Sequence, residues 1–196
     1  MICAKAPLPW EAAPQGAPDR LAALLVDRVP QLDTARLVLR APVIGDFDSY
    51  AAIMMSDRAV HMDGPLSRRD AWLDFTQYVA GWLLRGCGMW TVVAREDTRV
   101  LGFVSVAMAY GDRAHELGYL FRPDAGGRGF ATEAVRAARD YAFGAMGLST
   151  LVSYVAPENT RSIALAQRLG AKPDEAAAAE LDDDCRVFRH SPDGGM

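Results

Sequence analysis

One segment constrains the fold of this chain more than any other: a strand-like run leads into a glycine turn, which opens directly onto a helix. Residues 116–121 form the predicted strand, three glycines fall between Gly126 and Gly129, and a helix is expected from about Gly129 to Ala145. The first main-chain N–H groups of such a helix lack internal acceptors, and the helix dipole adds partial positive charge there. Glycines let the backbone approach a ligand closely. The turn is therefore predicted to seat a diphosphate.

Glycine turns also occur in nucleotide-binding motifs and in simple helix caps. A Walker P-loop needs a lysine after its glycines, and no lysine lies between residues 6 and 171, which excludes that motif. A dinucleotide-binding fingerprint would need a glycine where Thr132 stands. Considered by itself, the turn is also consistent with a helix cap that binds no ligand.

Helix and strand patterns alternate along the rest of the chain. The expected strands cover residues 36–40, 89–95, 100–108, 116–121, 151–155 and 185–189, and the expected helices cover residues 45–56, 68–85, 129–145 and 160–169. Ser67 is the expected cap of the second helix. This order predicts a mixed α/β (α+β) domain in which helices flank one sheet. The strands before and after the long helix should pair in parallel, because a strand–helix–strand crossover returns parallel. The last strand is expected at an edge.

The chain is expected to divide into three parts. Residues 1–30 hold five of the 11 prolines and are predicted to form an N-terminal extension, with a short helix from Asp19 to Val29 that Pro30 stops. Residues 31–190 are predicted to form one domain, and residues 191–196 a tail.

Composition and charge narrow the classes of function. A net charge of −4 argues against a protein that coats nucleic acid. No run approaches the roughly 18–20 apolar residues of a membrane span, and the first residues lack a secretory pattern, so a cytoplasmic protein is expected. The three cysteines and three histidines are not at metal-ligand spacing, so no metal site is predicted.

Four stretches resemble the GNAT acetyltransferases and, within them, the RimJ/RimL-like ribosomal-protein acetyltransferase branch. In chain order they are Thr34–Arg40, Glu116–Tyr119 with Gly127–Ala134, Asn159–Ser162 with Leu169 and Gly170, and Val187–His190. The second is similar to the family's acetyl-CoA motif, and the third to the motif that follows it. The resemblance covers about four fifths of the chain and implies the GNAT acyl-CoA N-acyltransferase fold, with a mixed sheet of about 6–7 strands flanked by about 4 helices.

The resemblance also implies a site for acetyl-CoA as co-substrate. The backbone around Phe121 and Arg122 would pair with the pantetheine arm. Asn159 would bond the pantetheine, and Ser162 would lie near the sulfur. The diphosphate would be held by the glycine turn, whose implied contributors are Gly127, Arg128, Gly129, Ala131 and Thr132. Gly126 stands where the family has glutamine or arginine, which removes a side chain but leaves the amide donors.

Acetylation of an amine requires removal of a proton and departure of a thiolate. Glu116 is the predicted general base, since it begins the strand that leads into the acetyl-CoA site; the alternative is a solvent-facing strand residue. Ala166 stands where many GNAT enzymes carry a tyrosine acid. Ser162 is the predicted partner of the sulfur, although capping of the helix accounts for a serine at this position equally well.

The predicted function is an N-acetyltransferase that passes the acetyl group of acetyl-CoA to a primary amine by direct attack in a ternary complex, as a monomer or homodimer. The acceptor is a protein N-terminus or a small-molecule amine, and nothing in the helices between residues 45 and 85 decides between them. The alternative is a non-catalytic acyl-CoA-binding or sensor domain on the same fold.

Overall fold

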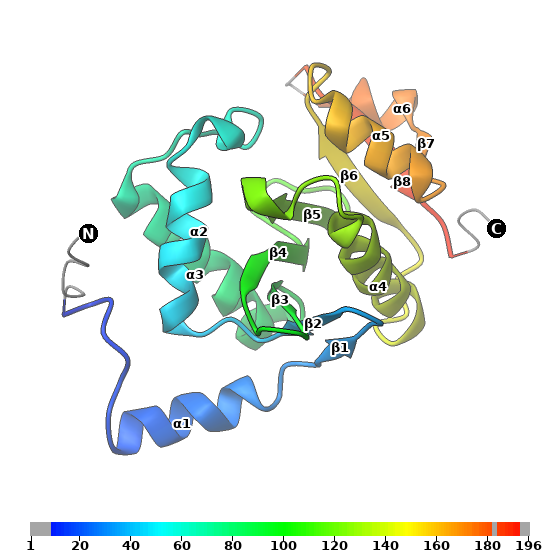
Figure 1. Cartoon of the computed structure of the whole chain (residues 1–196). Helices are drawn as coiled ribbons and strands as arrows, with labels where there is room; N and C mark the ends of the chain where they lie inside the picture. The colour runs from blue at the N-terminus through cyan, green and yellow to red at the C-terminus, as the bar shows by residue number, and fades with distance from the viewer. Residues whose placement is uncertain (1–8, 182–183, 193–196) are drawn as a thin grey trace.

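The computed structural model describes residues 9–181 and 184–192, in which helices cover both faces of one mixed sheet (Figure 1). The beginning of the predicted extension, with Cys3, lies outside the described residues, as do residues 182–183 and residues 193–196 of the predicted tail. The division of the chain into three parts stays a prediction.

The sheet has eight strands in the order β1-β2-β3-β4-β5-β6-β8-β7. They are β1 Leu32–Asp33, β2 Leu37–Arg40, β3 Met89–Ala94, β4 Val100–Ala107, β5 Glu116–Phe121, β6 Leu151–Val155, β7 Lys172–Pro173 and β8 Arg186–His190. Neighbouring strands run antiparallel except β5 and β6, which run parallel on either side of the long helix in the chain. The predicted mixed sheet and its parallel pair are confirmed.

Two features of the sheet differ from the prediction. The described residues form eight strands instead of about 6–7, because β1 and β7 are only two residues long and too short to show a periodic pattern. The strand expected at an edge is internal: β8 pairs with β6 on one side and with β7 on the other. Its Val187 and Phe188 are buried accordingly.

The helices begin and end where capping chemistry allows. They are α1 Ala17–Val26, α2 Phe47–Met54, α3 Arg68–Arg85, α4 Phe130–Gly144, α5 Thr160–Arg168 and α6 Glu175–Ala178, with 3₁₀ turns η1 Ile44–Asp46, η2 Asp57–Ala59 and η3 Pro123–Ala125. Ser67 caps α3 as predicted, since its hydroxyl accepts a hydrogen bond from the Asp70 amide. The expected bounds of α1 were wrong: Pro18 lies in its first turn, ahead of Asp19, and the helix ends before Pro30 is reached.

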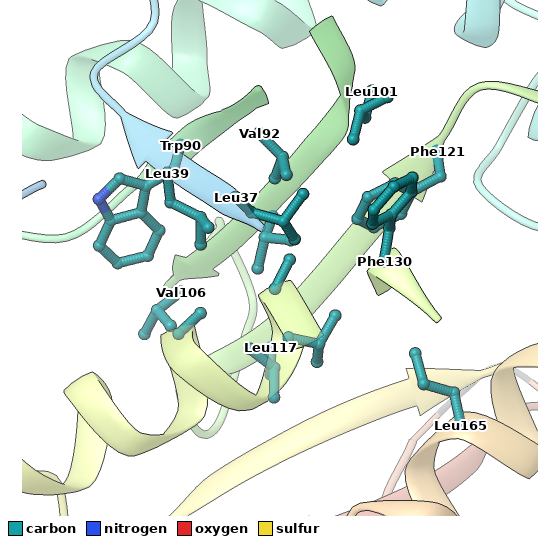
Figure 2. Close-up of a cluster of buried hydrophobic side chains, with 14 of the residues drawn as sticks. Leu37, Leu39, Trp90, Val92, Leu101, Val106, Leu117, Phe121, Phe130 and Leu165 are labelled. Atoms are coloured by element: carbon teal, nitrogen blue, oxygen red, sulfur yellow. The ribbon is translucent and has the colours of Figure 1, made fainter. Parts of the chain in front are cut away.

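Each face of the sheet has its own core. Along β3 the side chains alternate, so Trp90 and Val92 pack toward α4, while Met89 packs toward α2 and α3. Figure 2 shows part of the cluster on the α4 side. Trp90 is fully buried, and its indole N–H donates to the Pro30 carbonyl at 2.7 Å. Burial of these clusters fixes α4 on one face of β5 and the α2–α3 pair on the other.

β5 and β6 are paired at one end only. Glu116 opposite Val152 is the one register pair found between them in the described chain. Beyond it, the Ser153 hydroxyl donates to the Leu117 carbonyl at 2.8 Å and replaces a main-chain bond. The rest of the β5 edge is therefore unpaired along the side that faces β6, and this gap positions the site.

Candidate functional site

A cleft of about 2870 Å³ lies along the unpaired edge of β5. Two sets among its lining residues matter for the argument. One set, which we call the turn wall, consists of Gly126, Gly127, Gly129, Ala131, Thr132, Asn159 and Ser162. The other, which we call the acidic wall, consists of Asp63, Asp74, Asp112 and Glu116. The predicted base and the predicted diphosphate turn thus share one continuous cleft.

The glycine turn has the backbone conformation that a ligand site needs. Gly127 and Gly129 have φ angles of +72° and +77°, which side chains on L-residues rarely allow. A Cβ atom at Gly127 would meet nothing within 4 Å, so this glycine faces open space. Gly129 is the N-cap of α4 and supplies no side-chain hydrogen bond to the helix.

The main-chain donors of the turn are not used up inside the protein. In the described part of the chain, the amides of Gly127, Gly129, Ala131 and Thr132 donate to no other protein group. The amide of Gly126, by contrast, donates to the Pro123 carbonyl at 3.2 Å. Residue 126 therefore offers neither a side chain nor an N–H group to the cleft, and the four amides that follow it carry the donor potential.

Two arginines that were predicted to bind the cofactor do not line the cleft. The Arg122 amide donates to the Leu101 carbonyl, and its own carbonyl accepts from the Ala125 amide, so its main chain is bonded internally. The Arg128 guanidinium packs over the Phe130 ring, 4.6 Å from the ring centroid. The other predicted cofactor residues all line the cleft: Phe121, Gly127, Gly129, Ala131, Thr132, Asn159 and Ser162.

Strand geometry selects which main-chain groups of β5 face the gap. Residues of an antiparallel pair bond across alternate positions, and the Arg122 bond to β4 sets that phase. The main-chain groups of Tyr119 and Phe121 therefore point away from β4, toward the gap. The Phe121 carbonyl accepts from the Arg58 Nε at 3.1 Å, which ties η2 to the end of β5. Tyr119 is the position of β5 best placed for pairing with a ligand.

Glu116 is half-buried at the start of β5. Its pKa is raised to about 7, first by burial and then by the negative charges of Asp112 and Asp63, against a hydrogen bond from the Tyr154 main chain. A carboxylate with a pKa near neutrality is suited to general base catalysis. Gly118 keeps space beside it: a Cβ there would lie 2.7 Å from the Ser105 hydroxyl and 4.0 Å from a Glu116 carboxylate oxygen.

The other members of the acidic wall come from outside the recognised motifs. The Tyr50 hydroxyl donates to Asp74, whose pKa is raised by burial and by the charge of Asp63. In the described residues, no member of the acidic wall forms an ion pair with a basic side chain. Sequence reasoning missed Asp63, Asp74 and Asp112 because they lie in a loop, in α3 and in the β4–β5 connection, where nothing in the local pattern distinguishes them.

The start of α5 settles which residue caps that helix. The Asn159 side chain accepts from the Ser162 amide at 3.2 Å, so Asn159 caps the helix and the Ser162 hydroxyl does not. Ala166 is buried against Val155 and Phe188, away from the cleft. The Tyr119 hydroxyl instead reaches this end of the cleft and donates to the Ser162 carbonyl at 3.3 Å. Sequence reasoning missed Tyr119 as a polar group, although it lies in the recognised Glu116–Tyr119 stretch.

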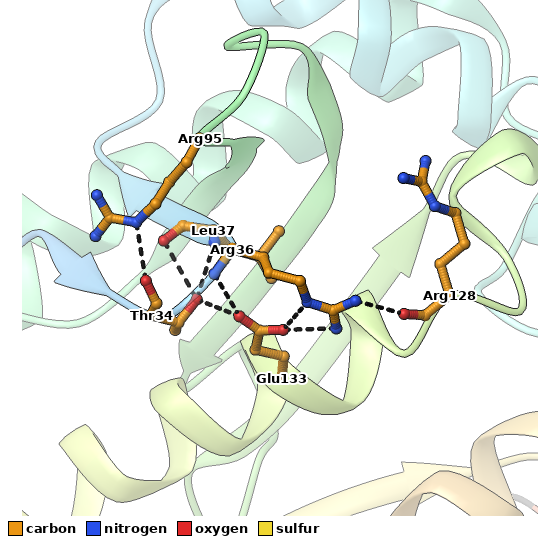
Figure 3. Close-up of polar contacts among 6 residues, drawn as sticks. All are labelled: Thr34, Arg36, Leu37, Arg95, Arg128 and Glu133. Carbon is orange, nitrogen blue, oxygen red and sulfur yellow. Dashed lines mark hydrogen bonds and ion pairs between the residues drawn. The ribbon is translucent and has the colours of Figure 1, made fainter.

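A polar network contacts the backbone of the glycine turn (Figure 3). Glu133, in the first turn of α4, accepts from the Thr34 hydroxyl at 2.6 Å and from the Arg36 Nε at 2.7 Å. Arg36 also donates to the Arg128 carbonyl at 2.9 Å. Thr34 and Arg36 were recognised only as part of an opening strand, since their partners lie almost a hundred residues further along the chain.

Comparison with known proteins agrees with this geometry. The acetyltransferase (GNAT) domain family matches residues 36–172, which is more than half of the chain. The chain belongs to the GNAT acetyltransferase family, in its RimJ/RimL-like part. It is an N-acetyltransferase of that family, and the expected fold is confirmed.

Among Bacillus subtilis (strain 168) proteins, the chain is 27% identical to the uncharacterized N-acetyltransferase YnaD over 81 residues, 41% of this chain and 48% of YnaD. It is also 27% identical to the uncharacterized N-acetyltransferase YoaA over 145 residues, 72% of this chain and 82% of YoaA. The match to YnaD thus spans about half the length of that relative.

Solved structures of GNAT proteins have the same architecture. An acetyltransferase from Agrobacterium tumefaciens str. C58 aligns with a TM-score of 0.78 at 35% identity, over 83% of this chain and 94% of that one. RimL, a ribosomal L7/L12 alpha-N-protein acetyltransferase determined in complex with coenzyme A, aligns with a TM-score of 0.67 at 17% identity, over 85% of this chain and 100% of that one. No described helix is both long enough and apolar enough to cross a membrane.

Proposed function

We propose that this GNAT protein binds acetyl-CoA along the β5 edge and transfers the acetyl group to a primary amine, with Glu116 as the general base. The observation that carries the proposal is the shared cleft: unused main-chain donors of the turn wall and the Glu116 carboxylate face the same space. Four main-chain amides that belong to one helix start, line one cleft and lack acceptors in the described residues are suited to bind an anion, and the diphosphate of acetyl-CoA is such an anion. The binding of coenzyme A by RimL supports this choice of ligand.

The pantetheine arm runs, in this proposal, along the unpaired edge of β5. The main chain of Tyr119 and Phe121 lies there, where β6 has left the sheet edge open. The arm would pair with this edge like a short strand, which places the thioester between the turn wall and the acidic wall. The Asn159 amide group would bond the arm from the side of α5 with the nitrogen that capping does not use.

The chemical step needs a neutral amine next to the thioester. Glu116 takes one proton from the ammonium group, and the neutral amine nitrogen attacks the thioester carbon to form the C–N bond. The C–S bond then breaks, and the second proton of the nitrogen passes to the departing thiolate, so the products are the amide and the free thiol of coenzyme A. Proton transfer to a carboxylate with a pKa of about 7 costs about 1 kcal/mol from an α-ammonium group, and about 5 kcal/mol from an alkyl ammonium group. The difference favours an α-amino group, such as a protein N-terminus, over a lysine-like amine.

Departure of coenzyme A as a thiolate needs a polar partner for the sulfur. Ser162, whose hydroxyl does not cap α5, is the proposed hydrogen-bond donor. Tyr119 is a poorer source of a proton, because burial raises the pKa of its phenol to about 12, whereas a simple thiol has a pKa of about 8.5. The phenol therefore keeps its proton and acts at most as a second hydrogen-bond donor.

Two measurements test the proposal. Calorimetry with acetyl-CoA should show binding to one site, and its absence at millimolar acetyl-CoA would overturn the proposed cofactor. Release of free thiol should then be measured with three classes of amine: peptides with free α-amino groups, N-terminally blocked peptides that contain lysine, and polyamines. We expect the fastest release with free α-amino groups. Binding without thiol release from any amine would favour the sensor alternative.

A further inference from the structure

The network of Figure 3 reaches the backbone of the proposed diphosphate site through a single side chain. Arg36 follows β1 and leads into β2, so it belongs to an edge of the sheet that is remote in sequence from α4. Its guanidinium forms a 2.7 Å ion pair with Glu133 and donates to the Arg128 carbonyl at 2.9 Å. A Cβ at Gly129 would lie 3.4 Å from an Arg36 nitrogen. The guanidinium therefore lies directly against the Arg128–Gly129 peptide.

This contact fixes the orientation of one peptide plane. In a trans peptide the carbonyl of one residue and the N–H of the next point in opposite directions. When Arg36 holds the Arg128 carbonyl on its own side, the Gly129 N–H must point to the other side. Gly129 lines the cleft, and its amide has no acceptor in the described residues. A positive φ of +77° at Gly129 then leads the chain into α4.

Glu133 holds the guanidinium in place. It accepts from the Thr34 hydroxyl, from the Arg36 amide at 2.9 Å and from the Arg36 Nε, so the carboxylate and the guanidinium restrain each other. Burial alone raises the pKa of Glu133, but these hydrogen bonds outweigh it and keep that pKa below its usual value. Glu133 also cancels most of the Arg36 charge, so the arginine acts on the ligand through geometry more than through its own charge.

We infer that Arg36 is a positioning residue for acetyl-CoA: clamped by Glu133, it turns the Gly129 amide toward the diphosphate. The inference rests on the proposed function, because it names the device that orients one donor of that site. It predicts that Arg36 matters only for carriers that contain a diphosphate. S-acetylpantetheine carries the same thioester and the same arm without the diphosphate, so it separates this role from general damage to the fold.

The decisive variant is Arg36→Ala in the full chain. We expect the KM for acetyl-CoA to rise about tenfold with kcat nearly unchanged, and kcat/KM for S-acetylpantetheine to stay at the parental value. Arg95→Ala is the matched control. Arg95 is another half-exposed arginine, which directly follows β3 and contacts the same β1–β2 connection. It donates to the Thr34 carbonyl at 2.8 Å and pairs with Asp33, and in the described residues it bonds to no residue of the glycine turn. It should leave both kinetic constants within about twofold of the parent.

Two further variants separate positioning from direct charge. Arg36→Lys keeps the charge but cannot span both the Glu133 carboxylate and the Arg128 carbonyl, so it should resemble Arg36→Ala. Glu133→Gln removes a negative charge beside the diphosphate, which on charge alone would tighten binding. Positioning predicts the opposite sign, with the KM for acetyl-CoA raised about threefold because Arg36 loses its clamp.

The outcomes are distinct. A parent chain that binds no acetyl-CoA would overturn the proposed function and this inference with it. If the parent binds acetyl-CoA and the Arg36→Ala variant binds it equally well, the inference alone is overturned. Equal losses with acetyl-CoA and S-acetylpantetheine, or tighter acetyl-CoA binding by Glu133→Gln, would also overturn it.

Discussion

The turn wall and the acidic wall meet at one cleft but are built in opposite ways. The turn wall offers main-chain N–H groups at the start of α4, where Gly129 leaves the helix without a side-chain cap. The acidic wall offers carboxylates, one of them from α3, and at the start of that helix the Ser67 hydroxyl accepts from the Asp70 amide. The first amides of a helix lack internal acceptors; α3 has a side-chain cap for one of them, whereas α4 has no side-chain cap. In our proposal, the uncapped start of α4 is kept for a ligand, whereas the Ser67 cap of α3 serves stability.

The largest effect should come from removing the base of the acidic wall. Glu116→Gln is expected to lower kcat about a thousandfold, because general base catalysis contributes on that scale. In the parent, kcat/KM should rise with pH and level off above about 7, where Glu116 is ionised. The variant should lose this rise. A parental rate and pH profile in steady-state assays of Glu116→Gln would contradict the assignment.

Glu116→Gln is expected to raise the stability of the fold at neutral and alkaline pH, although it lowers activity. The folded-state pKa of Glu116 is raised from 4.5 to about 7, so the folded protein binds this proton more tightly than the unfolded chain does. The free energy of unfolding therefore falls as pH rises from 4.5 to 7, and the penalty is complete above 7. Glu116→Gln should raise the melting temperature at a pH of about 8 and leave it close to the parental value at a pH of about 4.

A carboxylate placed in the turn wall would make both walls acidic and should weaken acetyl-CoA binding. Gly129→Asp forces a side chain into a left-handed conformation and puts an anion where the diphosphate is proposed to bind, so acetyl-CoA affinity should fall at least about 100-fold. Gly86→Asp is the matched control: Gly86 has a φ of +70° and open surroundings, but it ends α3 away from the cleft. Calorimetry should show an affinity loss in the first variant only, at a comparable loss of melting temperature.

A smaller effect is expected within the acidic wall. The charge of Asp112 helps to raise the pKa of Glu116, so Asp112→Asn should lower that pKa by less than about one unit. The pH–rate profile would shift toward acid, and kcat/KM at a pH of about 6 would rise about twofold. Asparagine keeps the oxygen that accepts from the Ala109 amide, so the loop should hold its shape. An unshifted profile would mean that Asp112 and Glu116 do not interact.

The smallest effect on catalysis should come from removing the Ser67 cap at the start of α3. Ser67→Ala removes the cap of α3 and is expected to lower the free energy of unfolding by about 1 kcal/mol. Urea unfolding would measure this loss. Both kinetic constants should stay parental, because Ser67 does not line the cleft. A large rise in the KM for acetyl-CoA would show that the two helix starts are not functionally distinct.

Prediction from sequence succeeded where the cause was local. The strand from Glu116 to Phe121, the glycine turn and the start of α5 at Thr160 were all located, because glycine φ angles, capping and strand alternation act over a few residues. It failed where pairing partners are distant. The place of β8 inside the sheet follows from its pairing with β7, a strand too short to leave a pattern.

The sequence by itself determined that a strand would end in a glycine turn with free amides at the start of a helix, since those features depend on neighbouring residues alone. Only the tertiary structure decided what surrounds that turn. Arg36 meets Glu133 across 97 positions, and Asp63, Asp74 and Asp112 come from three separate segments to line the same cleft as Glu116. Such contacts form because burial of the two cores brings distant segments together, and no local pattern records which side chains will meet.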